Sequence, residues 1–442
     1  MDKNTESQVA LENERKMLAE VQKMPWSRRV RAYVKFLGPG FLQSAMTLGS
    51  GTVAACLKAG STYGYKLLWI QPIAMILGAV VLAVVGKQVL ISGERPYRTF
   101  WNHLHPLLAI WWALSAMLAS VIWHIPQYSL GASSLKEMFE ALGVGSINPW
   151  FFGVLMLIGA TFLVFNYDKG LKGIRFFELA MKILVWAIVG LFAIVAIASG
   201  IQWDKFFGGL TNFYIPFDDP KGLTIVIGAL GAAVGINMVF LYPYSLLKKK
   251  WGKEHQGAAI FDLITSMALP FIFASTFIII ATANTIHGTD ANSLMDIIDI
   301  LGNVLGLKLS ALILGIGLFA IAFSSITTQM LAAGFTGCEM FKLPTDGKWY
   351  RFFALVPAIG IIGSSYSIPF WVGVVASSVA VTLMPFTLIG FFILNNNIKF
   401  LGKQMPRGGK RWGWNIALGL AIIVISIAGI VKIIVQLKLF NF

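Results

Sequence analysis

The sequence has little charge for its length. Only 12% of its 442 residues are charged, 57% are hydrophobic, and the mean hydropathy is +0.74. A soluble domain carries about 25% charged residues, and a disordered chain needs low hydrophobicity. The scarcity of charge therefore excludes a soluble enzyme and a disordered protein, and it indicates a polytopic membrane protein.

Cysteine is also scarce. The two cysteines, Cys56 and Cys338, belong to no Cys-x-x-Cys or Cys/His pattern, which argues against a disulfide framework and a cysteine-based metal site. The sequence shows no phosphate-binding loop, His-Glu-x-x-His motif or nucleophile motif. We therefore predict no enzymatic activity and no cofactor.

The net charge of +15 does not indicate a nucleic-acid partner. The basic residues lie in short clusters between apolar runs, which is typical of membrane-protein loops. The N-terminal arm and alternate loops hold most of the 35 Lys and Arg residues. This bias predicts a protein of the cell (inner) membrane with a cytoplasmic N-terminus and an extracytoplasmic C-terminus. The expected partner is the lipid bilayer; the oligomeric state stays open, and a monomer is compatible with the sequence.

Eleven apolar segments are long enough to span a bilayer. A polar surface helix over residues 4–24 and an interfacial anchor that reaches residue 35 precede them. The predicted spans are 36–60, 64–87, 106–138, 150–167, 173–200, 222–247, 260–284, 306–334, 352–366, 368–394 and 413–437.

Two of these spans carry helix-breaking residues. In the first span, residues 47–52 place Gly49 and Gly51 around Ser50; in the sixth, residues 240–245 contain Pro243. Interrupted helices at corresponding places of two halves indicate a secondary transporter with an inverted repeat and a substrate site at the bilayer midplane. We therefore divide the chain into an arm (1–35), two five-helix repeats (36–200 and 201–394), and a last loop and helix (395–442).

Several segments resemble the Nramp family of proton-coupled divalent-metal transporters. They are residues 38–42 (GPGFL), 59–60 (AG), 64–69 (GYKLLW), 173–178 (GIRFFE), 323–327 (FSSIT) and 383–386 (LMPF). The resemblance implies an all-α membrane protein with eleven transmembrane helices, the LeuT-type 5+5 inverted repeat, and breaks in helices 1 and 6.

The site departs from the family pattern. The family has Asp-Pro-Gly-Asn at the first break, where this chain has Gly49-Ser50-Gly51-Thr52, and Met-Pro-His at the second, which we place at Tyr242-Pro243-Tyr244. Gly49, Thr52 and Tyr242 would thus occupy the family's metal positions, and we predict no metal ligand there. The family's acids in span three fall near Ile125 and Tyr128, and spans one, two, six, eight and ten contain no carboxylate.

A bare divalent cation would meet only hydroxyls and carbonyls at such a site, a poor exchange for its water shell. Glycines allow close approach to the backbone, hydroxyls donate hydrogen bonds, and aromatic rings face cations. The predicted substrate-binding residues are Gly49, Ser50, Gly51, Thr52, Phe240, Tyr242, Pro243, Tyr244 and Ser377, with Trp123 and Tyr128 as further aromatic candidates.

Two polar or small-residue features in the spans have two interpretations each. His124 could respond to protons, or it could be a neutral histidine hydrogen-bonded to a carbonyl. Gly231 and Gly235 are a Gly-x-x-x-Gly pair, which we interpret as a packing surface rather than a ligand site.

The function expected from these residues is alternating-access transport of a small polar or zwitterionic organic solute. The first alternative is a divalent-cation transporter for ions such as Mg²⁺ or Mn²⁺ without the family's usual proton coupling. The second alternative is a membrane receptor that does not transport.

Overall fold

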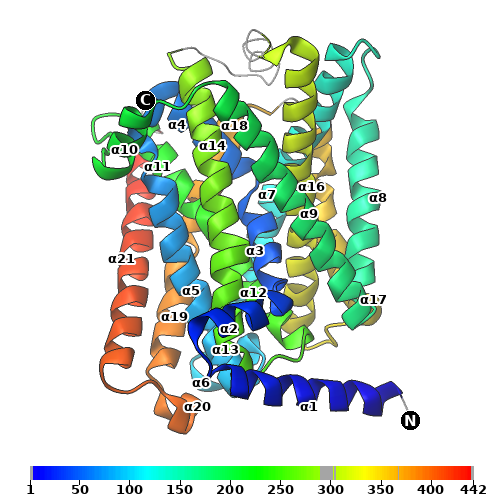
Figure 1. Cartoon of the computed structure of the whole chain (residues 1–442), viewed down its shortest axis with the longest axis vertical. Coiled ribbons are helices and arrows are strands. Elements are labelled where there is room, and N and C mark those ends of the chain that lie inside the picture. The colour runs from blue at the N-terminus through cyan, green and yellow to red at the C-terminus, as the bar shows by residue number, and fades with distance from the viewer. Residues whose placement is uncertain (1–2, 289–301, 303–304, 367, 440–442) are drawn as a thin grey trace.

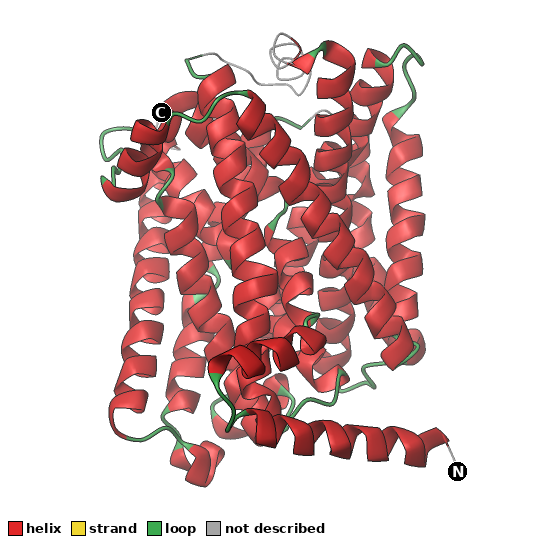
Figure 2. Cartoon of the chain, in the orientation of Figure 1, coloured by secondary structure: helices red, strands yellow, loops and turns green. Residues whose placement is uncertain are grey.

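The computed structural model describes residues 3–288, 302, 305–366 and 368–439, so part of the predicted second repeat lies outside the described residues. The described residues form helices, turns and loops with no strand (Figure 2). The helices of the first predicted repeat are α3 (Pro39–Thr47), α4 (Ser50–Tyr63), α5 (Ile70–Ser92), α7 (Pro106–Ala141), α8 (Pro149–Tyr167) and α9 (Leu171–Ala198).

The second predicted repeat has the same kind of elements. They are α11 (Pro220–Ala233), α12 (Ile236–Lys248), α13 (Gln256–Asp262), the π-helix η4 (Leu263–Ala268), α14 (Leu269–Thr285), α16 (Leu307–Met340), α17 (Gly347–Leu355), the 3-10 helix η5 (Val356–Ser365), α18 (Phe370–Thr382) and α19 (Pro385–Asn395). The last helix is α21 (Gly408–Leu439), and shorter helices are α1 (Lys3–Val21), α2 (Trp26–Tyr33), α6 (Pro96–His103), α10 (Trp203–Thr211) and α20 (Ile398–Leu401).

Eight helices among the described residues are long and apolar enough to cross a membrane, or nine if the pair in the tenth predicted span, bent by 42°, counts as one. The first predicted span, which is divided into α3 and α4, is not in that count. The ninth, 352–366, is wrong as a continuous α-helix: its residues form the end of α17 and then η5. Gly360 and Gly363 of η5 lie directly against the α7 backbone at His124 and Ile125, where side chains would collide. Eleven spans remain a prediction.

The break in the first span lies where the glycines predict it. Leu48 leaves the helical conformation (φ −75°, ψ 63°), and Gly49 is extended (φ −109°, ψ −178°) before α4 begins at Ser50. A side chain at Gly49 would press against the ends of the Gln127 and Ser325 side chains, at 2.5 and 2.8 Å from the added Cβ. The tight approach of α7 and α16 explains the glycine.

The predicted position of the second break is wrong. α12 runs without interruption through Pro243, and the chain is instead extended at Val234 and Gly235 (ψ 123° and 157°), between α11 and α12. A glycine weakens a helix by about 1 kcal/mol relative to alanine. Asn237 adds a competing local bond, since its side-chain oxygen accepts from the backbone N–H of Met238 at 3.0 Å.

The two broken helices lie at the centre of the bundle. α11 contacts α4 and α5, and α12 contacts α3, α5 and α7. In the most apolar stretch of the α11–α12 pair, 83% of the residues are buried, against 39% for α8, α9 and α21. The low values fit helices that face lipid, whereas the broken pair is enclosed by protein, as an interrupted backbone in a membrane requires.

The polar surface helix predicted over residues 4–24 is present as α1, which crosses the lower end of the molecule in Figure 1. We call this end the arm end; α21 runs from it to the opposite end. Leu18 and Val21 of α1 are buried. Three long-range bonds fix the arm to the turn after α12: Glu14 to His255 (2.9 Å), Arg15 to the Lys250 carbonyl (3.2 Å) and Gln22 to the Glu254 carbonyl (3.0 Å).

Candidate substrate site between the two broken helices

Residues from both breaks enclose one small cavity. Its volume is about 10 Å³, roughly the space that one water molecule needs for its centre. It is lined by Met46, Trp123, Gly231, Ala232, Gly235, Asn237, Met238 and Gln329. The conformation is therefore closed around a site for a single small group.

Two side-chain amides supply polar groups to this cavity. The Asn237 amide nitrogen lies 3.5 Å from the Ser120 hydroxyl oxygen, and its oxygen accepts from Met238. The Gln329 side chain is 1% exposed, and its amide interacts with the buried His124 ring, without a well-formed hydrogen bond to either amide atom among the described residues. Buried polar groups are normally hydrogen-bonded, so Gln329 has capacity left for a ligand or a water molecule beside His124.

The first break contributes polar backbone and hydroxyl groups. The Ser50 N–H donates to the Gln127 side-chain oxygen at 3.0 Å, while the Gln127 amide nitrogen and the Ser50 hydroxyl lack partners in the described structure. The Thr52 hydroxyl donates to the Thr47 carbonyl at 2.5 Å. Ser50 and Thr52 thus lie in the first turn of α4, and Thr52 is occupied in holding the break together.

Gly51 and Ser377 lie in contact. A side chain at Gly51 would collide with the Ser377 hydroxyl of α18 and press on the Trp123 ring at 3.1 Å. The Ser377 hydroxyl donates to the Gly373 carbonyl at 2.9 Å within its own helix. The structure therefore brings Gly49, Ser50, Gly51, Thr52 and Ser377 together around the first break, but none of these five residues is among those that line the cavity.

The predicted aromatic residues of the sixth span are not at the second break. Tyr242 packs against Gly86 of α5, and its hydroxyl oxygen lies 3.4 Å from the Ala259 carbonyl oxygen. The Phe240 and Tyr244 rings are parallel, with centroids 5.0 Å apart. All three side chains are at most 3% exposed. None of them lines the cavity, and neither does Pro243. Their displacement follows from the misplaced break, because they lie between about one and a half and two and a half turns of helix beyond Gly235.

His124 is fully buried next to this site. Its Nδ1 lies 2.7 Å from the Ser120 carbonyl oxygen, which can only accept, so Nδ1 carries a proton. The hydrogen bond to a carbonyl that one interpretation expected is therefore present.

Three amide residues near the breaks are absent from the predicted site: Gln127, Asn237 and Gln329. The sequence contains one indication of this site, because Asn237 is the only Asn or Gln within the predicted sixth span. Gly231 does pack as expected, against the Ser377 carbonyl, but Gly235 is the extended residue before α12. If the family's Met-Pro-His lies at the observed break, its places here read Gly235, Ile236 and Asn237.

The buried acids lie at the arm end. Asp262 accepts hydrogen bonds from the Gly38 and Gly40 N–H groups, at 3.0 and 2.6 Å, and so caps the first turn of α3. Glu178 of α9 forms an ion pair with Lys249, which directly follows α12, at 2.9 Å. Both acids are therefore held by the outer ends of the half-helices that meet at the site.

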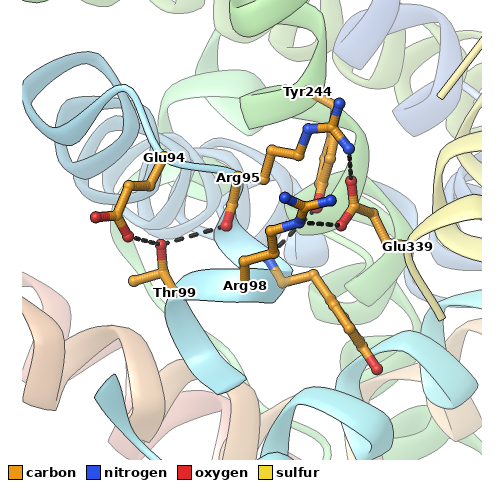
Figure 3. Close-up of polar contacts among 7 residues, drawn as sticks. Glu94, Arg95, Arg98, Thr99, Tyr244 and Glu339 are labelled. Atoms are coloured by element: carbon orange, nitrogen blue, oxygen red, sulfur yellow. Dashed lines mark hydrogen bonds and ion pairs between the residues drawn. The ribbon is translucent and has the colours of Figure 1, made fainter. Parts of the chain in front are cut away.

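A further buried acid, Glu339, belongs to a set of contacts that fixes α12 and α16 to α6 (Figure 3). Glu339 is buried near the end of α16 and lies 3.0 Å from Arg95 and 3.9 Å from Arg98. The backbone N–H of Tyr97 lies 3.3 Å from the Tyr244 hydroxyl oxygen of α12. Tyr244 is therefore part of the arm-end contacts rather than of the cavity.

At the opposite end, a side-chain hydrogen bond joins the end of α4 to the start of α11. The Tyr63 hydroxyl, at the end of α4, donates to the carboxylate of Asp219, which also accepts from the Lys221 N–H at 2.9 Å and caps α11. The hydrogen bond from Tyr63, aided by the backbone N–H groups of Lys221 and Gly222, holds the pKa of Asp219 below its usual value.

No group of three or more His, Cys, Asp or Glu side chains in the described ranges is placed to hold a metal ion. A cation at the breaks would therefore meet amide, hydroxyl and carbonyl oxygens, with Met46 and Met238 as the only sulfur-containing residues that line the cavity. Oxygen ligands suit hard cations such as Mg²⁺, which bind few protein groups and keep several waters.

The family profile described as "Nramp: Natural resistance-associated macrophage protein-like" matches residues 40–434. The chain belongs to the Nramp family. It is 24% identical over 419 residues to a divalent metal cation transporter MntH of a Nostoc strain, covering 88% of this chain and 89% of the relative. It is 28% identical over 403 residues to the metal transporter Nramp6.2 of Populus trichocarpa, covering 83% and 68%.

Solved structures support the fold. An Eremococcus coleocola manganese transporter superposes with a TM-score of 0.73 at 16% identity, covering 91% of this chain and 87% of that one. MhsT in complex with L-phenylalanine superposes with a TM-score of 0.57 at 14% identity, covering 88% and 98%. This Nramp-family membrane transporter thus has the predicted LeuT-type all-helical fold.

Proposed function

We propose that this protein transports divalent cations of the Mg²⁺ and Mn²⁺ kind by alternating access, and that the ion keeps part of its water shell. The observation that carries the proposal is the single small cavity between the two breaks, into which Asn237 and Gln329 place neutral amides. Family membership supports a divalent cation, since relatives over most of the chain carry the name divalent metal cation transporter. The expected organic solute is less well supported, because the predicted aromatic residues of the sixth span are packed elsewhere and, of the predicted aromatic candidates, Trp123 alone is among the residues that line the cavity.

The ion is expected to keep part of its water shell because the groups at the site are neutral. A stripped divalent ion in a buried site needs negative or soft ligands to offset its lost hydration. Gly49 stands where the family has an aspartate, so the first break supplies no carboxylate. Amide and hydroxyl groups can instead bond to the waters of a hydrated ion, and such water-mediated bonds are nearly as good as direct ones.

Loading requires the half-helices to separate, because the closed cavity has room for about one water-sized group. The contacts of α3 and α12 at the arm end and the Tyr63–Asp219 contact of α4 and α11 are the natural places to open. Following the basic-residue bias, we assign the arm end to the cytoplasm.

Uptake into liposomes tests the proposal. We expect saturable uptake of both Mg²⁺ and Mn²⁺ without acidification of the lumen, because no carboxylate at the breaks is available to carry a proton. Asn237→Ala and Gln329→Ala should each weaken apparent affinity about fivefold, the effect of losing a hydrogen bond worth about 1 kcal/mol.

The matched control is Asn395→Ala, which removes a buried amide that bonds Asn415 between α19 and α21, away from the cavity. It should leave affinity unchanged. Saturable uptake of a zwitterion without divalent uptake would contradict the proposal and restore the organic-solute hypothesis. Absence of any uptake by folded protein would instead favour a receptor.

A further inference from the structure

An open pocket lies at the end of the molecule opposite the arm end, and it shares no lining residue with the cavity between the breaks. Its volume is about 720 Å³, within the range of about 300–1,000 Å³ that ligand sites have. Its walls are the end of α4 with the following 3-10 helix η2 (Gly64–Leu67), helix α10 and the end of α14. Figure 1 shows α10 at the end opposite α1.

Polar contacts hold these walls together. The Tyr65 hydroxyl of η2 donates to the Asn284 side-chain oxygen of α14 at 2.9 Å and accepts from the Gln202 N–H, directly before α10, at 3.3 Å. α10 also lies against η2, since a side chain at Gly209 would collide with the Tyr65 carbonyl oxygen. The pocket is therefore enclosed by elements that are fixed to one another.

The helix α10 has two faces of different chemistry. Asp204, Lys205 and Asn212 line the pocket. Trp203 and Phe207, four residues apart and so on one face, have side chains that are 58% and 60% exposed. Exposed aromatic rings are typical of the interface between membrane and water. This arrangement fits a helix at the membrane surface, with the pocket at the depth of the lipid headgroups.

The pocket carries more positive than negative charge. Lys66 and Lys205 line it, both are exposed, and neither forms an ion pair with an acid of the described chain. The Lys66 ammonium group lies 5.4 Å from the centroid of the Tyr214 ring, another lining residue. Asp204, the acid among the described lining residues, is in the first turn of α10, where the helix end offsets a negative charge.

We propose that this pocket binds the headgroup of an anionic phospholipid, with Lys66 and Lys205 facing the phosphate. A lysine binds a phosphate as a point charge, and the volume suits a headgroup with its glycerol better than a small inorganic ion. Tyr63 also lines the pocket, and its hydroxyl donates to Asp219. A bound headgroup would therefore lie beside the contact that joins α4 to α11.

The test is labelling of the purified full-length protein in detergent with a photoactivatable phosphatidylglycerol. Labelled peptides are identified by mass spectrometry, so lipid at the basic clusters of the arm end is counted separately. We expect saturable labelling of a peptide from residues 202–215 that unlabelled phosphatidylglycerol competes away better than phosphatidylcholine. Lys66→Gln combined with Lys205→Gln should raise the half-saturating concentration about thirtyfold, about 2 kcal/mol.

The matched control is Lys308→Gln, which removes an exposed lysine at the start of α16, at the same end of the molecule but outside the pocket. It should stay within twofold of the wild type. Melting temperatures report folding for every variant. Absence of saturable labelling at residues 202–215, or equal labelling of the double variant and the wild type, would overturn the proposal.

Two further arms identify the headgroup. Asp204→Asn removes the negative charge and should tighten phosphatidylglycerol binding; weaker binding would indicate a zwitterionic headgroup whose ammonium pairs with Asp204, and would overturn an anionic one. Glycerol 3-phosphate and inorganic phosphate should compete poorly. If either competes as well as the lipid, the pocket binds a free phosphate and the lipid is overturned. The assay contains no divalent ion, so its outcome is independent of the proposed cargo.

Discussion

The middle of this protein and its arm end differ in the polar groups that they bury: neutral amides in the middle and carboxylates at the arm end. Glu178, Asp262 and Glu339 are buried at the arm end, with basic side chains or backbone N–H groups beside them. The cavity between the breaks holds amides instead. A carboxylate with a permanent partner stabilises a closed end, whereas a site that empties and refills would leave a buried charge unpaired in one of its states.

Removing the acid with the most complete set of partners should have the largest effect. Asp262→Ala leaves the Gly38 and Gly40 N–H groups unpaired in a buried place, and hydrogen bonds to a charged group are worth about 1.5–3 kcal/mol each. We expect a loss of about 3 kcal/mol in the free energy of unfolding, measured as a lower melting temperature of the purified protein in detergent.

The conservative change Asp262→Asn separates capping from charge. It keeps one oxygen that can accept from these N–H groups, so it should restore part of the lost stability. Equal melting temperatures for Asp262→Ala and the wild type would show that the acid does not hold α3.

Replacing Gly49 with an aspartate should give the first break a buried carboxylate, as the arm end has. The backbone at Gly49 has an extended conformation that an aspartate can adopt, but an added side chain requires the ends of the Gln127 and Ser325 side chains to move aside. Once they have moved, the Gln127 amide and the Ser325 hydroxyl can donate to the carboxylate. Gly49→Asp should tighten Mn²⁺ binding at least tenfold, about 1.4 kcal/mol, in calorimetric titration.

Gly49→Asn is the control for this change because it adds the same bulk without charge. If both variants bind Mn²⁺ equally, charge is not what the wild-type site lacks. A Gly49→Asp protein that folds but binds Mn²⁺ no better than the wild type would mean that the cation binds elsewhere.

The smallest effect is expected at the contact between α4 and α11. The pKa of Asp219 is below its usual value in the folded protein, so the stability that Asp219 adds is present above the ordinary Asp pKa and is lost as pH falls through the lowered folded-state value. Asp219→Ala should cost about 1 kcal/mol at pH 7 through loss of the cap on α11. The difference in melting temperature from the wild type should shrink in strong acid; an undiminished difference would refute the charged contact.

The sequence predicts the membrane-protein class, the surface helix α1 and the break at Gly49, because each depends on local composition or on a glycine pair. It misleads at the sixth span. Pro243 looks like the breaking residue, yet enclosing helices support α12 through it, and the break occurs at Gly235 beside Asn237. Gln127 and Gln329 join the site only through packing of α7 and α16 against the breaks, which no local pattern encodes.

The central claim is that the transported cation binds at the carboxylate-free break and not at the acid-rich arm end. An anomalous difference map from crystals soaked in Mn²⁺ tests it most directly. The account predicts one peak in the cavity between Asn237 and Gln329, separated from the protein ligands by water. A peak in direct contact with Glu178, Asp262 or Glu339, with none at the cavity, would contradict it.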